Sequence, residues 1–193
     1  MIIMRSFFII ALFAVSLALH SQVEESVAPD KEGQKEKSKL SERLTFGGEI
    51  GLSFGSITYI KLAPIVGYYL TDRLVAGVGP IYIYEKYKYY NYETSMYGGK
   101  VFTSFTIIKG SAGGGGFGLG NIQLHVENEV LNVEKYDFEN ERIWIDNLLL
   151  GGGLFQPFGG RGGISIFILF DVTQNRYSPY YSNNPVFKFG FNF

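Results

Sequence analysis

Residues 44–55, LTFGGEIGLSFG, alternate strictly between two kinds of side chain. One face carries large apolar residues, and the other carries small or polar residues with a single carboxylate, Glu49. A period of two residues indicates a β-strand, because successive side chains of a strand point to opposite faces. This alternation restricts the fold more than any other feature of the chain, since similar segments recur up to the last residue.

Further strand-like segments follow, and no segment has a convincing helical period. Aromatic and glycine enrichment supports strands and tight bends, with Tyr 14, Phe 17 and Gly 25 among 193 residues. The pattern predicts eight strands, at residues 44–55, 57–70, 74–90, 97–108, 122–136, 142–158, 164–174 and 185–193. The facing of the third, fourth and sixth segments stays unassigned, because their alternation is not clear.

The chain begins with a segment that is typical of export. Arg5 precedes an apolar run over residues 7–19, which is shorter than the ~20 residues of a membrane-spanning helix. We therefore predict a signal peptide over residues 1–21, with cleavage after Ser21 or, alternatively, after Ala18. A retained anchor helix is the other interpretation.

Residues 22–43 carry interleaved charges and few large apolar side chains. Such a segment cannot bury enough surface to offset its ordering entropy, so we predict a disordered periplasmic leader. A short solvated helix over residues 34–43 is the alternative. The remaining residues, 44–193, form the predicted barrel domain.

Composition excludes several classes of function. The net charge of -1 offers no electrostatic footprint for nucleic acid, and the absence of cysteine excludes disulfides and thiolate chemistry. The glycine runs lack the Lys-Ser/Thr of a phosphate-binding loop, and no His/Asp/Glu set has metal-ligand spacing. We expect no cofactor, no metal site and no catalytic residue.

Segment length and tyrosine placement distinguish a membrane-spanning barrel from a water-soluble one. Most segments reach the ~9–11 residues that a tilted strand needs to cross a bilayer. Tyrosines crowd near predicted strand ends, as in the interfacial girdles of membrane barrels. We predict an all-β, eight-stranded antiparallel up-and-down transmembrane β-barrel. A soluble lipocalin-like periplasmic barrel is the alternative.

The chain ends with four phenylalanines at alternate positions, Phe187, Phe189, Phe191 and Phe193. If the last strand pairs with the first, no sheet edge remains open. The first three rings then face lipid, and Phe193 lies at the periplasmic rim.

The opposite face of the strands supplies charges that would meet inside the barrel. Charges in a narrow lumen are costly unless they are paired. We expect Glu49 and Lys188 to point inward at similar depth. The predicted polar network of the lumen comprises Glu49, Lys61, His125, Glu127, Glu129, Asp171 and Lys188.

The chain resembles the small bacterial outer-membrane β-barrel family of the OmpX/OmpA-domain and "porin family" type. The resemblance rests on the signal peptide, on LHVENEVLNVE (124–134), LLLGGGLFQPFGGRGG (148–163) and SPYYSNNPVFKFGFNF (178–193), and on the terminal Phe. The glycine-rich connection at residues 109–121 departs from the family, since it is longer than usual.

The resemblance implies location in the outer membrane of a Gram-negative bacterium, as a monomer in contact with outer-membrane lipid. It also implies that the assembly machinery reads the terminal phenylalanines. Tyrosine-rich loops at residues 86–97 and 175–184 are candidate contacts for a surface ligand. We expect a structural or surface-interaction role, without enzyme activity or an open pore. A lipid acyl hydrolase that uses His125, and a narrow channel or hydrophobic-ligand carrier, are the alternatives.

Overall fold

The computed structural model describes residues 40–193, except 90, 111–119, 136–140, 160–161 and 182–183. A single helical turn, α2 (Leu40–Arg43), precedes the sheet. The strands are β1 (Leu44–Ser53), β2 (Ile57–Tyr69), β3 (Leu74–Tyr87), β4 (Tyr92–Ile108), β5 (Asn121–Glu134), β6 (Arg142–Gly159), β7 (Gly162–Asp171) and β8 (Val186–Asn192).

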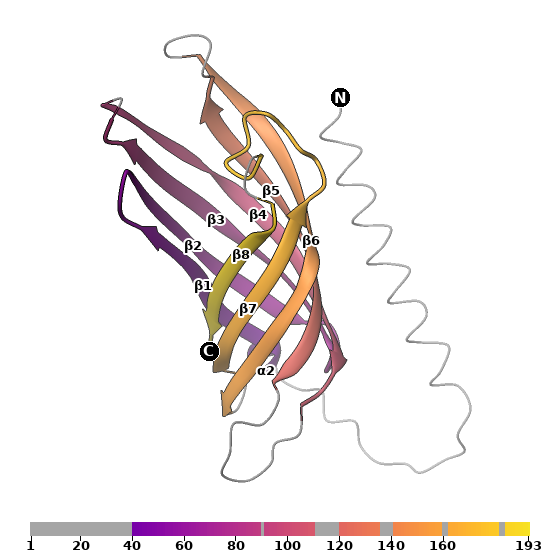
Figure 1. Cartoon of the computed structure of the whole chain (residues 1–193). Helices are drawn as coiled ribbons and strands as arrows, with labels where there is room; N and C mark the ends of the chain where they lie inside the picture. The colour runs from indigo at the N-terminus through magenta and orange to yellow at the C-terminus, as the bar shows by residue number, and fades with distance from the viewer. Residues whose placement is uncertain (1–39, 90, 111–119, 136–140, 160–161, 182–183) are drawn as a thin grey trace, which may run out of the picture. The chain divides into compact units, whose positions relative to one another are not determined.

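These strands form a closed barrel in which each strand pairs with the next in sequence (Figure 1). Every pair is antiparallel, including the β1–β8 pair that closes the sheet. The predicted all-β, eight-stranded, up-and-down architecture is therefore confirmed. We call the end with the β2–β3, β4–β5 and β6–β7 connections the turn end, and the opposite end the loop end.

The two ends of the barrel domain meet at a short seam. Three residue pairs join β1 to β8, running from Gly47↔Asn192 to Glu49↔Gly190. Beyond them, the Phe46 and Phe193 backbones exchange two hydrogen bonds of 3.3 and 2.7 Å. The Thr45 hydroxyl donates a third bond to the Phe193 carbonyl. The last residue of the chain is thus part of the closure.

The outward face of the sheet is apolar. In β8, Phe187 and Phe189 are 60% and 57% exposed, whereas Lys188 between them is 5% exposed. In β7, Ile164, Ile166, Ile168 and Phe170 are exposed while the alternate residues are buried. The polar face of the strands is therefore enclosed by the barrel. No helix among the described residues is long and apolar enough to cross a membrane.

Among the predicted strand bounds, the start of β4 differs most from the structure. Strand β4 begins at Tyr92, so residues 92–96 extend the sheet instead of forming an outer loop. Their partners in β3 run from Tyr87↔Tyr92 to Ile83↔Met96. Asn91, with a φ of 46°, makes the tight turn before them. The segment was missed because its residues, YETSM, do not alternate between polar and apolar side chains.

The β7–β8 connection spans residues 172–185 and returns into the barrel rather than standing away from it (Figure 1). Tyr180 of this segment is buried in contact with β2 and β5 residues. Part of a predicted surface loop is therefore interior structure. The predicted signal peptide and most of the leader lie outside the described residues, and α2 occupies the leader's last four positions.

Candidate functional site: the polar core of the barrel

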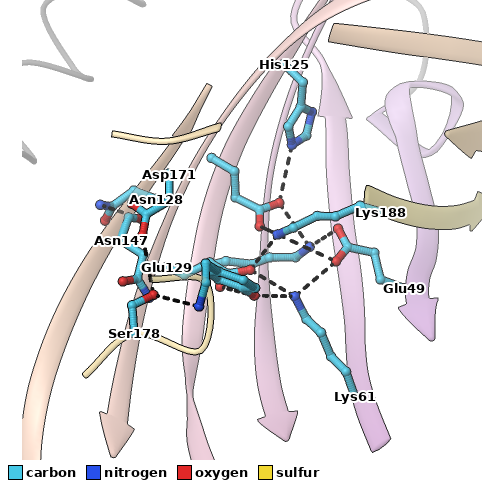
Figure 2. A network of polar contacts seen from close by, with 12 residues as sticks. Glu49, Lys61, His125, Asn128, Glu129, Asn147, Asp171, Ser178 and Lys188 are labelled. Atoms are coloured by element: carbon cyan, nitrogen blue, oxygen red, sulfur yellow. Dashed lines mark hydrogen bonds and ion pairs between the residues drawn. The ribbon is translucent and has the colours of Figure 1, made fainter. Parts of the chain in front are cut away.

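The core of the barrel contains charged side chains contributed by five strands (Figure 2). The alternation of each strand turns these side chains inward, so their charges converge on the barrel axis. The set comprises Glu49 of β1, Lys61 of β2, Lys100 of β4, Glu127 and Glu129 of β5, and Lys188 of β8. We call these six residues the lattice.

Lys188 and Lys61 form one half of the lattice. The Lys188 ammonium donates to Glu129 at 2.6 Å and also to Glu127. The Lys61 ammonium donates to the same Glu129 oxygen at 3.0 Å, and it lies 3.4 Å from Glu49. Glu129, which is fully buried, therefore accepts from two ammonium groups, as a carboxylate without water contact requires.

Lys100 links the other two carboxylates. Its ammonium donates to Glu49 and, at 3.1 Å, to Glu127. The Glu49 and Lys188 side chains lie 3.9 Å apart, and Glu49 is paired with Gly190 across the seam. The two side chains are thus inward and at similar depth.

The lattice is electrically balanced. The Glu49, Glu127 and Glu129 oxygens lie within 4.8 Å of one another, a spacing that would suit a metal ion. Three ammonium groups already occupy the space between them, however, and supply three positive charges for three negative ones. A divalent cation would have to displace lysines, so the lattice is a set of ion pairs rather than a metal centre.

His125 joins the lattice through Glu127. Its Nε2 lies 3.3 Å from the Glu127 carboxylate, and its Nδ1 lies 2.7 Å from the Ser104 hydroxyl. The two ring nitrogens thus lie within hydrogen-bond distance of the Glu127 carboxylate and the Ser104 hydroxyl. The ring lies between Phe102 and Phe167, with centroids 5.6 and 4.4 Å away.

Tyr180 connects the β7–β8 segment to the lattice. Its hydroxyl donates to Glu129 at 2.7 Å and accepts from the Lys61 ammonium at 3.0 Å. The Lys188 ammonium lies 5.6 Å from the ring centroid. The segment is therefore fixed at the centre of the barrel by a charged hydrogen-bond partner on each side of one hydroxyl.

Two apolar clusters accompany the lattice inside the barrel. One comprises Ala63, Ile81, Ile83, Met96, Leu131, Val133 and Ile145. The other comprises Leu149, Phe167, Leu169, Tyr180 and Val186. Because packed apolar groups exclude water, these clusters keep the lattice in a low-dielectric setting, where both its attractions and its desolvation costs are large.

Asp171, which was predicted to join this network, makes no direct contact with the six lattice residues but is connected to Glu129 through Ser178 and Tyr180. It is buried at the loop end of β7, where it accepts from the Thr173 amide at 3.0 Å and from the Ser178 hydroxyl at 3.4 Å. Its backbone exchanges two hydrogen bonds with the Asn184 side chain. Asp171 therefore holds the β7–β8 segment, because the strand ends there and the segment turns back over it.

Sequence reasoning missed Lys100, Tyr180 and Ser104. Lys100 and Ser104 lie on β4, whose facing was not assigned because apolar and polar residues do not alternate there, although burial alternates along this stretch in the structure. Charge arithmetic offered a signal for Lys100, since the predicted network held two lysines for four carboxylates. Nothing in the sequence placed Tyr180 in the core, because a segment's return into a barrel depends on the whole fold.

The terminal phenylalanines lie on the outward face. Phe187, Phe189 and Phe193 are exposed, Phe191 is half-buried, and its ring centroid lies 5.5 Å from that of Phe193. Tyr82, Tyr97 and Trp144 are also exposed. Aromatic rings are therefore exposed on several strands of the outward face.

Comparisons with protein-family models, curated proteins and solved structures find no match for this chain. The resemblance to small outer-membrane barrels therefore rests on the sequence features alone.

Proposed function

We propose that the chain is an integral outer-membrane β-barrel protein, exported with cleavage of its signal peptide, that has a structural or surface-interaction role and no open pore. One observation carries the proposal: the polar and apolar faces of the barrel are inverted relative to those of a water-soluble barrel. The ion pairs are buried inside, while Phe187, Phe189 and the isoleucines of β7 cover the outside.

The energetic argument favours lipid around this surface. Large exposed apolar patches are unfavourable in water and mark contact with a membrane or another protein. A closed barrel also satisfies its backbone hydrogen bonds internally, which hydrocarbon demands. The Tyr97 and Trp144 rings, 6.2 Å apart, and Arg142, 5.1 Å from the Tyr97 ring, suit the boundary between acyl chains and headgroups.

The filled lumen supports a role without bulk transport. The interior of an eight-stranded barrel is just wide enough for side chains, and here the lattice, two apolar clusters and Tyr180 fill it. A surface ligand would then contact the exposed residues at the loop end, which include Tyr89 and Tyr181.

Fractionation tests this proposal directly. The protein should separate with the outer membrane, resist alkaline extraction, and migrate differently on gels before and after heating. Recovery of the protein in the soluble periplasmic fraction would contradict it.

A second candidate function, ester hydrolysis, is favoured by the Ser104–His125–Glu127 contacts. Ser104 supplies the hydroxyl that sequence reasoning could not nominate, and His125 is placed to take its proton. Against this function, Ser104 is buried, and the Glu127 carboxylate is shared between two lysines. Labelling by a fluorophosphonate probe that is lost in Ser104→Ala would favour the hydrolase, and absence of labelling would exclude this chemistry.

A further inference from the structure

Asp171 is a buried carboxylate whose charge is not balanced by a lysine or an arginine. Among the residues that the structure describes, no ammonium or guanidinium group lies within ion-pair distance of it. Its oxygens meet only the Thr173 amide and, at a long 3.4 Å, the Ser178 hydroxyl. An ionised carboxylate with so little compensation is costly to bury.

Asn147 lies near Asp171 (Figure 2), and its buried side-chain amide also lacks polar partners. Leu149 is opposite Asp171 in the β6–β7 pair, and Asn147 is the next inward-facing residue of β6. Its side chain is 0% exposed, yet neither Oδ1 nor Nδ2 has a hydrogen-bond partner. A buried amide with both atoms unsatisfied requires an explanation, and a bound ion or an ordered water is among the explanations for such groups.

These groups converge on one place. Figure 2 shows Asp171, Asn147 and Ser178 together, on the side of the network away from the lattice lysines. All three are buried, and together they offer a carboxylate oxygen, an amide oxygen and a hydroxyl oxygen. Hard cations such as calcium prefer oxygen donors of this mixed kind, completed by backbone carbonyls or water.

We propose that Asp171, Asn147 and Ser178 bind a calcium ion at the loop end of the barrel. The ion would neutralise Asp171 and satisfy the Asn147 oxygen. It would also tie β6 and β7 to the β7–β8 segment, since Ser178 belongs to that segment and the Ser178 Oγ accepts from the Tyr180 amide at 3.1 Å. Calcium would thus hold Tyr180 in the core. The site is independent of whether the barrel lies in a membrane.

Titration of calcium chloride into the EGTA-treated protein, purified in a neutral detergent, tests the site. Isothermal titration calorimetry should find one site with a Kd of about 10⁻⁴–10⁻³ M, the range of extracellular calcium modules. Magnesium should bind more weakly, because it gives up water reluctantly and demands octahedral geometry. Calcium should also raise the unfolding temperature until the site is saturated.

Two variants and one control separate calcium binding from a merely structural role. Asp171→Asn and Asn147→Leu should each weaken calcium binding by about tenfold or more, since each removes a ligand or its charge. Glu93→Gln, which changes an exposed carboxylate at the loop end, should bind like the parent protein. In EGTA, Asp171→Asn should be at least as stable as the parent, because it removes an unbalanced buried charge.

The proposal is overturned if calcium produces neither binding heat nor a thermal shift in the parent protein. In that case ordered water satisfies Asn147. An equal calcium response in Asp171→Asn also overturns it, because binding then occurs elsewhere. If Asp171→Asn is destabilised by the same amount with and without calcium, the residue only anchors the segment, and the site does not exist.

Discussion

Lys188 is the residue whose charge matters most to the polar core. It donates to two fully buried carboxylates, Glu127 and Glu129, from the last strand of the chain. Removing one partner of a buried ion pair leaves the other charge uncompensated, which costs more than the pair contributes. The lattice should therefore be far more sensitive to substitution than any ion pair at the barrel surface.

Lys188→Leu should lower the free energy of unfolding by about 3–5 kcal/mol, measured by denaturant titration of the folded barrel in detergent. The matched control is Lys86→Leu, which removes a lysine paired with Glu93 at 3.2 Å where both side chains are exposed. This change should cost about 0–1 kcal/mol. Equal effects of the two substitutions would show that the lattice does not stabilise the barrel.

Tyr180 tests how the β7–β8 segment is held. Tyr180→Phe keeps the ring but removes the hydroxyl that joins Lys61 and Glu129. We expect a loss of about 1–3 kcal/mol in unfolding free energy, because charged groups lose a buried hydrogen-bond partner. Tyr181→Phe, at an exposed position, is the control and should be neutral. A neutral result for Tyr180→Phe would mean that the segment is held by its apolar contacts alone.

At the residue scale, the sequence predicted most of the lattice, because alternation together with the cost of unpaired buried charge assigns a direction to each acidic or basic side chain. Glu49, Glu127, Glu129 and Lys188 follow from that argument. Asp171 also points inward, but its connection to Glu129 runs through Ser178 and Tyr180 of the β7–β8 segment, and alternation does not reveal that path.

At the scale of elements, glycines permit the strands to approach closely. A Cβ atom at Gly151 of β6 would lie 2.0 Å from the Ile168 carbonyl oxygen of β7, a distance that backbone atoms cannot relieve without separating the strands. At Gly99 of β4, the nearest atom would be 3.5 Å away. Gly151 and Gly153 are thus required by the β6–β7 pair, whereas a Cβ atom at Gly152 would meet the Gln123 carbonyl oxygen of β5 at 2.9 Å.

Gly151→Ala should therefore lower the unfolding temperature or prevent folding, at a cost of about 1–3 kcal/mol or more. Gly99→Ala should leave the unfolding temperature almost unchanged. Heat-modifiable gel mobility measures both. If Gly151→Ala folds and melts like the parent, the β6–β7 pair has more freedom than its geometry indicates.

A substitution in the terminal strand can separate its proposed recognition by the assembly machinery from its contribution to the stability of the barrel. Phe193→Ala keeps the backbone bonds between residues 46 and 193 but removes the exposed ring. If the assembly machinery reads that ring, the variant should accumulate less in the outer membrane than the parent, while its refolded form melts at nearly the same temperature. Normal accumulation in cells would remove Phe193 from the proposed recognition signal.

Element types could be predicted from the sequence better than element ends. The bounds of strands in which aliphatic residues alternate with small or polar ones, such as β1 and β7, were predicted within a few residues. Such alternation identifies the buried and the exposed face directly. Strand β4 was placed five residues too late, since its first residues, YETSM, show no alternation in the sequence and are recognised as a strand only by their pairing with β3. Pairing is a property of two segments and is not visible in either one.

At the scale of the whole molecule, closure was predictable because an unpaired edge would remain otherwise, and the first and last strands were the free ones. A lumen filled by side chains is what the width of an eight-stranded barrel predicts. The contribution of Tyr180 was not predictable, because the composition of the β7–β8 segment suggested a surface loop. Because Tyr180 of this segment lies inside the barrel, we expect the intact protein to be silent in planar bilayers at moderate voltage. Stepwise channel currents would favour the narrow-channel alternative.

The central claim is that hydrocarbon surrounds the outside of this barrel. The chain has no cysteine, so single cysteines can be introduced and spin-labelled without background. With labels at positions 166, 168 and 170 of β7 in reconstituted bilayers, electron paramagnetic resonance can compare collisions with oxygen and with a water-soluble nickel complex. We predict dominant oxygen collisions at all three positions and dominant nickel collisions at exposed Thr173, beyond the strand. Dominant nickel collisions at 166, 168 and 170 would place the outer face in water and contradict the account.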